Sequence, residues 1–512
     1  MTFLESLEGH KWQWPILASF VALYLVRMAV RYHRLRYFRG PWGSGFSKLQ
    51  YDYKVYTGEA HAWCRDVNEK YGPIARIGPN SLITSSSNVW MHINTKPEYK
   101  RSKWYFSAVR VEHQRDHIFS QTDTRLHDER RKQIAPGYSG RENLELESSI
   151  DYRLLELLDL IRTKYLSDPS RGYINPMDLS KKIQYFTMDV ISTLGMGRPG
   201  FGMLRADADI DNYIRSSEEG MRIANTFSAL RLSWIAQAPV IGKLVCPQST
   251  DVKGFGAMMG ACFRAVDERL RDADHDKRRD MLASFIRHKL VGDELKSEVL
   301  ETLIAGSDTT AGALRATMLY VMANKRVYVK LQEEIDRAVR EGRVSGEGVI
   351  SYSTAKQLPY LQAVIKEGLR VFPPVRNIVP KDVPVGGDTV LVEGKPVFLP
   401  GGVDIGFSAL AMHRDKKVYG EDADSFRPER WFDANQGKLA AMMKVHELSF
   451  GHGRWQCLGR NVAQMELNKA IFERQLFRYF DWAIANPVKP WDAMNALGLF
   501  IINDFLVQVS AR

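Results

Sequence analysis

The chain has 512 residues, of which 45% are hydrophobic and 26% are charged, so it is globular and can bury a large core. Its four cysteines, at positions 64, 246, 262 and 457, are too scattered for a disulfide framework or a zinc site, which favours a reducing compartment. The net charge of +11 would suit nucleic acid, anionic lipid or an acidic partner. Because the basic residues form no nucleic-acid stripe, we expect membrane lipid and a partner protein, and no nucleic acid.

An apolar run over residues 16–26 is flanked by Trp12 and Trp14 on one side and by arginines on the other. A helix over residues 12–30 would reach about 28 Å, close to the roughly 30 Å hydrocarbon core of a bilayer. Arg27 lies near the basic end, where its side chain can snorkel to the headgroups. A signal peptide has an apolar run of this length, but its charges precede the run and a small-residue cleavage site follows it.

The arginines after the run place the following domain on the cytosolic side. We therefore predict a single-pass transmembrane helix within an anchor and basic flank over residues 1–39. A catalytic domain over residues 40–512 follows, and we expect the protein in the endoplasmic reticulum membrane with this domain in the cytosol.

The first part of the large domain combines a small strand region with helices. Residues 74–85 place two short apolar runs around a Gly-Pro-Asn turn, which predicts a hairpin. His127 and Arg131 lie four residues apart on an arginine-rich helical segment, so they share one face, and an exposed basic surface is the simplest explanation. Residues 144–289 have a mostly helical, amphipathic pattern, in which Phe227 and Leu230 either line a substrate channel or only pack.

The longest predicted helix runs from Asp293, a residue type that caps helices, to about Asn324, because this interval contains no proline. Its middle reads Ala-Gly-Ser-Asp-Thr-Thr over residues 305–310. Glycine costs about 1 kcal/mol inside a helix, and serine and threonine hydroxyls compete for its backbone hydrogen bonds. This local conflict indicates a function.

Two segments further on carry charged residues at fixed spacing. Glu367 and Arg370 lie three residues apart on a predicted helix that ends before Pro373. Such a pair on a surface adds only about 0.2 to 0.5 kcal/mol and has no functional meaning by itself. Arg430 lies within Phe-Arg-Pro-Glu-Arg-Trp over residues 426–431.

The segment that organises the chain is Phe-Gly-His-Gly-Arg-Trp-Gln-Cys-Leu-Gly, residues 450–459. Gly453 and Gly459 permit positive φ angles and close approach. Backbone amides around Cys457, with the positive end of a helix that starts nearby, would favour its thiolate, and Phe450 would shield it from water. The pattern predicts a thiolate held against a buried metal, and the alternative is a buried structural thiol.

This segment resembles the haem-binding loop of the cytochrome P450 superfamily. The fixed positions of that loop are filled here by Phe450, Gly453, Cys457 and Gly459. The family usually has Arg or His two residues before the cysteine, where it faces a haem propionate, but this chain has Trp455 there. The resemblance implies that Arg454 or the Trp455 indole makes that contact.

The remaining motifs of this chain occur in the same order along the sequence as in that family. Residues 305–310 match its Ala/Gly-Gly-x-Asp/Glu-Thr-Thr motif. The resemblance implies that Ala305 and Gly306 leave room for dioxygen, while Asp308 and Thr309 relay protons during its reduction.

The resemblance also implies roles for residues outside these two motifs. It joins Glu367, Arg370 and Arg430 in a buried network behind the haem. His127 and Arg131 match a helix that reaches the haem propionates, and His413 and Lys381 fall near further positions of that kind. The aromatic residues 104–106 match a loop that crosses the haem and touches substrate.

Taken together, the resemblance implies a mainly α fold with a smaller β region. The cofactor is expected to be heme b (iron protoporphyrin IX), with Cys457 as the axial iron ligand. O2 and electrons from an NADPH-cytochrome P450 reductase would be the co-substrates. We expect that reductase to dock on the basic residues Arg130, Lys132 and Lys444.

Within the superfamily, the cysteine loop and residues 135–140 resemble filamentous-fungal enzymes of secondary metabolism, similar to the pisatin demethylase group. The expected substrate is a lipophilic molecule of terpenoid or polyketide type. Three alternatives remain open: a haem-thiolate isomerase or dehydratase that uses no O2, a non-catalytic haem sensor, and a cysteine hydrolase. The hydrolase would need His446 or His452 as its base.

Overall fold

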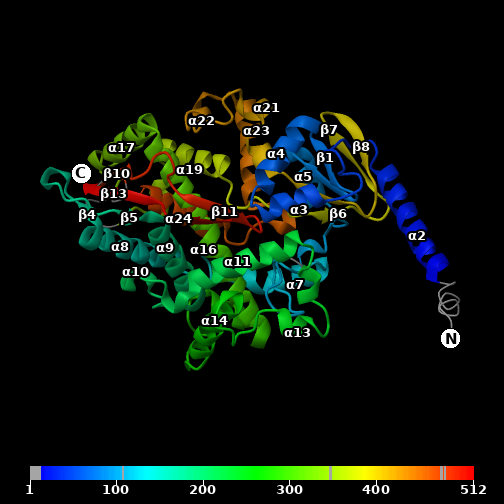
Figure 1. The fold of residues 1–512 in the computed structure, drawn as a ribbon. Coiled ribbons are helices and arrows are strands. Elements are labelled where there is room, and N and C mark those ends of the chain that lie inside the picture. Colours follow the sequence, from blue (N-terminus) through cyan, green and yellow to red (C-terminus); the bar gives the residue numbers. More distant parts are fainter. Residues whose placement is uncertain (1–12, 106–108, 345–348, 473–476, 478–479) are drawn as a thin grey trace.

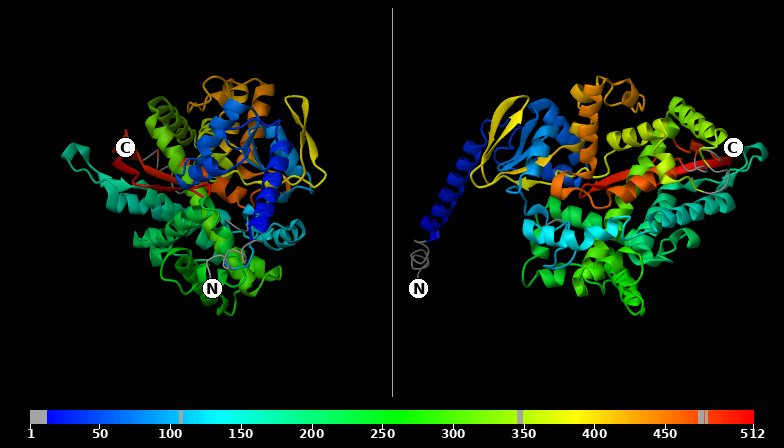
Figure 2. Two further views of the ribbon diagram at one scale, coloured as in Figure 1. Left: turned by 45° about the vertical axis from the view of Figure 1, so that its right-hand side comes forward. Right: turned by 180° about the vertical axis from the view of Figure 1, so that it is seen from behind.

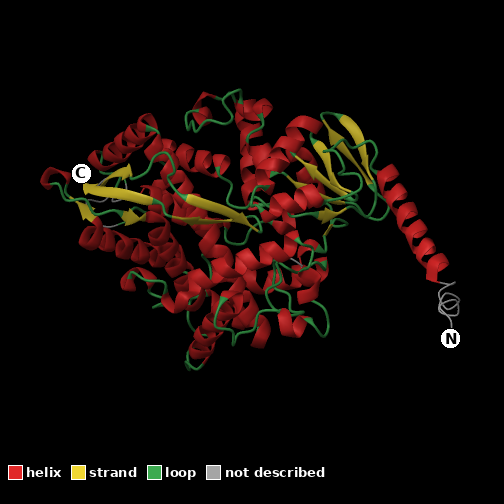
Figure 3. Cartoon of the chain, viewed as in Figure 1, coloured by secondary structure: helices red, strands yellow, loops and turns green. Residues whose placement is uncertain are grey.

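Helices form most of the fold, and one of them projects from the main body (Figures 1 and 3). The computed structural model describes residues 13–105, 109–344, 349–472, 477 and 480–512. The α-helices are α2 (Gln13–Arg34), α3 (Leu49–Tyr56), α4 (Ala60–Tyr71), α5 (Ser87–Thr95), α7 (Thr124–Ile134), α8 (Leu146–Leu160), α9 (Leu179–Met196), α10 (Met203–Ala206), α11 (Tyr213–Ala229), α12 (Ser233–Ala236), α13 (Gly242–Val245), α14 (Gly254–Leu270), α15 (Met281–Arg287), α16 (Gly292–Ala323), α17 (Lys325–Arg340), α18 (Tyr352–Ala355), α19 (Pro359–Val371), α20 (Ala409–His413), α21 (Lys416–Tyr419), α22 (Arg430–Asp433), α23 (Gln436–Glu447) and α24 (Arg460–Phe472). The expected mainly α fold is confirmed.

The strands form two larger sheets and two separate hairpins. They are β1 (Ile74–Gly78), β2 (Ser81–Thr84), β3 (Lys100–Arg101), β4 (Leu166–Ser167), β5 (Met177–Asp178), β6 (Lys381–Asp382), β7 (Asp388–Val392), β8 (Lys395–Leu399), β9 (Asp404–Phe407), β10 (Phe480–Ile484), β11 (Asp492–Ala496), β12 (Leu499–Asn503) and β13 (Leu506–Ala511). The first sheet has the order β1-β2-β9-β6-β3, the second joins β10, β13, β4 and β5, and the hairpins are β7-β8 and β11-β12. The predicted hairpin over residues 74–85 is confirmed, because β1 and β2 pair antiparallel.

The long helix α16 runs through the middle of the molecule and is buried around most of its circumference (Figure 1). Its bounds lie one residue before those expected from the sequence. Asp293 is not the N-cap, since Val291 takes that position and Asp293 lies in the first turn. In that position the positive end of the helix still stabilises its carboxylate, which pairs with Arg115 at 2.8 Å.

Helix α2 projects from the end of the molecule that carries the first sheet (Figures 1 and 2). Within the described residues it is the one helix long and apolar enough to cross a membrane, and none of that stretch is buried. Its 22 residues span about 33 Å, enough for the hydrocarbon core of a bilayer. Trp12 lies outside the described residues.

The last turns of α2 are fastened to the large domain. The buried Arg76 guanidinium donates to the carbonyls of Arg31 (3.2 Å) and Tyr32 (3.3 Å), and the Tyr32 ring stacks on Phe46 with centroids 5.0 Å apart. Leu35, just after the helix, is fully buried. These contacts fix the direction in which α2 leaves the domain.

Candidate active site

A cavity of about 630 Å³ lies between α16 and the loop that leads into α24. One wall carries Ala305 and Thr309 of α16, and Cys457 lies on the loop. Much of the remaining lining is apolar, including Ile118, Ile191, Phe227, Ile304, Val379 and Leu499. The structure thus brings the cysteine loop and the central motif of α16, about 150 residues apart in the chain, to one enclosed space.

The cysteine loop is tightly folded. A short 3-10 turn, Gly453–Trp455, precedes Cys457, whose amide donates to the Phe450 carbonyl at 2.8 Å. Gly453 has a φ of +62°, and a Cβ there would lie 3.0 Å from the Asn94 carbonyl oxygen. The positive φ and the close approach expected at this glycine are therefore both found.

Gly459 does not have the expected positive φ; the second loop glycine in that region is Gly451, at +74°. Gly459 lies directly before α24, and its carbonyl accepts a hydrogen bond of the first helical turn from the Ala463 amide at 2.9 Å. A Cβ at Gly459 would lie 3.9 Å from the Cys457 sulfur, which is ordinary contact.

Opposing effects act on the Cys457 thiol. Burial raises its pKa, and this is the largest effect. The backbone amides of Gly459 and Arg460, together with the Arg131 and Arg460 guanidinium groups, lower it. The expected stabilisation of the thiolate by amides is therefore present, but burial outweighs it. A bound metal ion would supply the rest, because metal coordination deprotonates a thiol.

The central motif of α16 divides between two sides of the helix. Ala305 and Thr309 face the cavity, and the Thr309 hydroxyl donates to the Ala305 carbonyl at 2.7 Å. Asp308, expected to relay protons beside Thr309, does not line the cavity. Successive helical residues point about 100° apart, and Asp308 turns toward α9, where its carboxylate accepts from the Gln184 amide. Burial raises the pKa of Asp308 to about 6.

Gly306 also has a role that the sequence did not indicate. It borders the cavity, but a Cβ built on it would lie 2.5 Å from Cγ1 of Ile191 on α9. The glycine therefore permits α9 and α16 to pack closely, in addition to any room that it leaves in the cavity.

We expect Gly306→Ala and Ile191→Ala each to destabilise the protein but to compensate one another in part. Overpacking costs about 1 to 3 kcal/mol, offset by about 1 kcal/mol of helix propensity, and truncating Ile191 costs about 2 to 5 kcal/mol. In the double variant the new methyl group fills part of the space left by Ile191. A double-mutant cycle of urea unfolding should show about 1 kcal/mol of favourable coupling; additive effects would contradict the close packing.

A cluster of cations lies at one side of the cavity. Strand β3 pairs antiparallel with β6 so that Arg101 lies directly opposite Lys381, an arrangement that is unfavourable for two like charges. Arg101 donates to the carbonyls of Ile118 (2.7 Å) and Phe119 (2.9 Å). The Lys381 ammonium lies 3.3 Å from the centre of the Trp455 ring.

Several polar atoms of this cluster have no hydrogen-bond partner. Within the described part of the chain these are Lys381 Nζ, Trp455 Nε1 and Arg101 Nε, all buried. Burial lowers the pKa of Lys381 well below its usual range, and Arg101 lowers it further. Unpartnered donors and like charges at a cavity wall fit an anionic ligand, such as the two propionates of a haem, and Cys457 in the same cavity fits its iron.

His127 and Arg131 both line the cavity, as the sequence placed them on one face of α7. His127 is buried, packs on Trp455 with ring centres 4.3 Å apart, and lies 3.1 Å from the Asp128 carboxylate. Arg131 donates to the Gln456 carbonyl at 2.8 Å, next to Cys457.

Two expected contacts differ in the structure. Arg454 does not line the cavity: its guanidinium pairs with Asp128 at 2.9 Å, so of the two candidates only Trp455 faces the cavity. Arg130 is not an open docking residue, because it points inward to Glu294 and Glu298, each at 2.7 Å. Phe106 lies outside the described residues.

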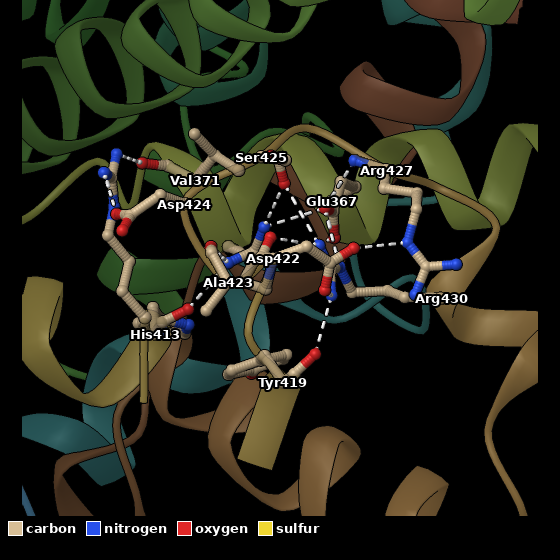
Figure 4. A network of polar contacts seen from close by, with 12 residues as sticks. Glu367, Val371, His413, Tyr419, Asp422, Ala423, Asp424, Ser425, Arg427 and Arg430 are labelled. Atoms are coloured by element: carbon tan, nitrogen blue, oxygen red, sulfur yellow. Dashed lines mark hydrogen bonds and ion pairs between the residues drawn. The ribbon is translucent and has the colours of Figure 1, made fainter. Parts of the chain in front are cut away.

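The expected contacts among Glu367, Arg370 and Arg430 are present, and all three side chains are buried (Figure 4). Glu367 accepts from Arg370 at 2.8 and 2.9 Å, from Arg430 at 2.9 Å and from the Trp431 indole at 3.0 Å. Other guanidinium donors bind backbone carbonyls of the segment before α22, namely Tyr419, Asp422, Ala423 and Ser425. Arg430 also pairs with the Asp422 carboxylate at 3.0 Å.

The network reaches the cavity through His413. Arg370 donates to the His413 carbonyl at 2.9 Å, and the His413 ring lies 3.3 Å from the Ser449 hydroxyl, beside Phe450. Both His413 and Ser449 line the cavity. The buried charges therefore support the loop that carries Cys457.

A sequence profile of the cytochrome P450 family matches residues 43–508, and the chain belongs to this family. It is similar to cytochrome P450 monooxygenase ABA1 of Pyricularia oryzae, with 40% identity over 99% of this chain and 98% of that protein. Cytochrome P450 monooxygenase aba1 of Botryotinia fuckeliana is 36% identical over 91% of this chain and 89% of its own length. Cytochrome P450 monooxygenase abl1 of Leptosphaeria maculans is 33% identical over 97% of this chain and 87% of its own length.

These relatives confirm the predicted resemblance to filamentous-fungal members of the superfamily. The chain is an enzyme, a cytochrome P450 monooxygenase. The family implies haem with a cysteine thiolate ligand. The cysteine predicted for that position from the sequence, Cys457, lines the cavity.

Proposed function

We propose that the chain inserts one oxygen atom from O2 into a lipophilic intermediate of fungal secondary metabolism, of terpenoid or polyketide type. The observation that carries this proposal is the position of Cys457 in a largely apolar cavity that also holds Ala305 and Thr309. When bound, a haem with a thiolate ligand supplies the activation of O2 that oxidation of an unactivated C-H bond requires. The second oxygen atom leaves as water, which consumes two electrons and two protons.

The residues of the chain have separable roles in this proposal. Cys457 would bind the iron, while Arg101, Arg131 and Lys381 would hold the propionates, with the His127 and Trp455 rings packed together beside them. Thr309 holds a hydroxyl at the cavity wall, where it orients protons. Asp308, half-buried and hydrogen-bonded to Gln184, positions α16 on α9 instead of touching substrate.

Lys381→Met should weaken haem retention, because it removes a buried amine that has no hydrogen-bond partner and whose protonated form a propionate would stabilise. A hydrogen bond to a charged group is worth about 1.5 to 3 kcal/mol, so haem loss should accelerate about tenfold or more. Transfer of haem to excess apomyoglobin measures this rate. The control is Lys132→Met, since Lys132 is exposed on α7. Equal rates in the two variants would argue against the propionate role.

We further propose that electrons come from NADPH through a cytochrome P450 reductase and that α2 anchors the chain in the endoplasmic reticulum membrane. Residues 1–39 then form the anchor and its flank, and residues 40–512 form the cytosolic catalytic domain. Of the three residues expected to meet the reductase, Lys132 is exposed, Arg130 is paired internally, and Lys444 bonds to Asn88 at 2.6 Å. Lys444 is also exposed and its partner Asn88 is uncharged, so Lys132 and Lys444 remain the candidates for docking.

Turnover under ¹⁸O2 tests the proposed reaction. Microsomes that contain the chain and a reductase would be supplied with NADPH and a panel of terpenoids and polyketides. The product should carry one ¹⁸O atom. A product without ¹⁸O would support an isomerase or dehydratase instead.

Thr309→Ala should lower the yield of product per NADPH consumed, because the hydroxyl that orients protons is lost from the cavity wall. Loss of such a proton-transfer group lowers the rate of the catalysed step by at most about 10² to 10⁴-fold. Thr309→Ser keeps the hydroxyl and should retain most of the coupling. Equal coupling in the alanine and serine variants would exclude this role for Thr309.

A further inference from the structure

The cavity contains a carboxyl group for which the proposed function gives no role. Glu301 lies four residues before Ala305 and eight before Thr309, so the three side chains share one face of α16. All three line the cavity. Asp251 and Glu466 line it as well, but neither lies on α16. Among these three acids, Glu301 is thus the one that shares a helical face with Ala305 and Thr309.

Glu301 is enclosed by protein, and Arg101 is close enough to act on its charge. Its side chain is 15% exposed and that exposed part faces the cavity. A close polar neighbour is His117, whose Nδ1 lies 3.2 Å from Glu301 Oε2. This buried nitrogen has no hydrogen-bond partner among the described residues. Nη1 of Arg101 donates hydrogen bonds to the backbone carbonyls of Ile118, Phe119 and Gln121.

The neighbours of His117 assign the protons of this pair. His117 Nε2 lies 3.3 Å from the Val109 carbonyl oxygen, which can only accept, so Nε2 carries the ring proton and Nδ1 is the acceptor. Burial lowers the pKa of His117 to about 4. Burial and Glu298 raise the pKa of Glu301 to about 8, against the opposing effect of Arg101. In the neutral carboxyl the proton would lie toward Nδ1 of His117, 3.2 Å away, and the other carboxyl oxygen would then be available to accept a hydrogen bond in the cavity that Glu301 lines.

An acceptor in a largely apolar cavity selects its ligand. Leaving a buried acceptor without a donor costs about 1 to 3 kcal/mol, so a ligand that offers a hydroxyl is preferred over one that does not. One helical turn separates Glu301 from Ala305, a rise of about 6 Å along α16. The hydroxyl would therefore lie about that distance from the reacting carbon.

We propose that Glu301, positioned by His117, binds a hydroxyl group of the substrate, so that the enzyme acts on a lipophilic alcohol and oxidises a carbon about one helical turn away. This inference rests on the proposed function, because it takes the reacting carbon to lie beside Ala305 and Thr309. It names the class of substrate: a neutral molecule with a hydrogen-bond donor at one end, produced by an earlier hydroxylation, reduction or hydrolysis.

The test uses probes whose binding does not depend on knowing the substrate. N-alkylimidazoles coordinate haem iron, and their chain extends into the cavity. Series with terminal hydroxyl, methyl ether or ammonium groups, and with chains of about four to ten carbons, would be titrated by the Soret shift into wild type, Glu301→Gln and Glu301→Leu. Gln keeps an acceptor for the cavity and a donor for His117, whereas Leu keeps neither.

In wild type the hydroxyl probe should bind about three- to tenfold tighter than its methyl ether at one favoured chain length. Glu301→Gln should keep this preference and Glu301→Leu should lose it, with ether binding changed little. Should the leucine variant fail to load haem, Glu301→Ala serves the same comparison. Equal binding of alcohol and ether at every chain length would overturn the inference.

A preference for the ammonium probe that disappears in Glu301→Gln would also overturn it, because the group would then act as a carboxylate. The Ile304→Leu variant serves as a control, since Ile304 lines the cavity without a polar group. Failure of the proposed function is distinguishable, because a chain without haem gives no Soret shift with any probe.

Discussion

Cys457→Ala should abolish monooxygenase turnover completely. The sulfur of Cys457 is the one thiol on the loop before α24, and the amides of Gly459 and Arg460 favour its thiolate. An alanine offers no ligand to iron, and the electron donation that O2 activation requires is lost with the thiolate. NADPH-dependent product formation in microsomes, normalised to folded protein, measures the effect.

The matched control is Cys262→Ala. Cys262 is a free thiol, fully buried on α14 and outside the lining of the cavity. Its replacement removes a small buried group and should leave turnover per haem unchanged. Residual turnover in Cys457→Ala, or equal losses in both variants, would contradict the assignment of Cys457.

Glu367→Ala should destabilise the folded protein by about 3 to 5 kcal/mol, because it leaves the buried Arg370 without its counterion and takes one of two carboxylates from Arg430, which still pairs with Asp422 at 3.0 Å. Glu367 accepts hydrogen bonds from both Arg370 and Arg430, which are themselves fully buried or nearly so. Water cannot replace the carboxylate at this depth. The loop that carries Cys457 is connected to the network through His413, so haem content should fall as well.

Urea unfolding of the full chain in detergent and the ratio of haem to protein measure these two effects. The control is Glu421→Gln, which removes an exposed partner of Lys416 and should change the free energy of unfolding by about 1 kcal/mol or less. A Glu367→Ala variant as stable as this control would show that the buried network does not support the fold.

Motifs read from the sequence located those parts of the site that depend on local spacing. The loop residues around Cys457 and the bounds of α16 follow from glycine positions and from the absence of proline, and both are local signals. The contacts of Glu367 with Arg430 could be expected only from the family resemblance, because 63 residues separate them.

The remainder depends on tertiary structure. Arg101 faces Lys381 because β3 pairs with β6, two strands of two residues each that have no periodic signal. The direction of Asp308 depends on which side of α16 meets α9. That side could not be identified from amphipathicity, because α16 is buried on nearly all sides. For the same reason the sequence did not single out Glu301 as a cavity residue.

The central claim is that Cys457 binds haem iron as a thiolate in this cavity. A carbon monoxide difference spectrum of the reduced protein in membranes, with Cys457→Ala beside wild type, tests it most directly. We predict the red-shifted Soret band of a thiolate haem in wild type and its loss in the variant. Folded wild-type protein without that band, or a band that persists in Cys457→Ala, would contradict the account.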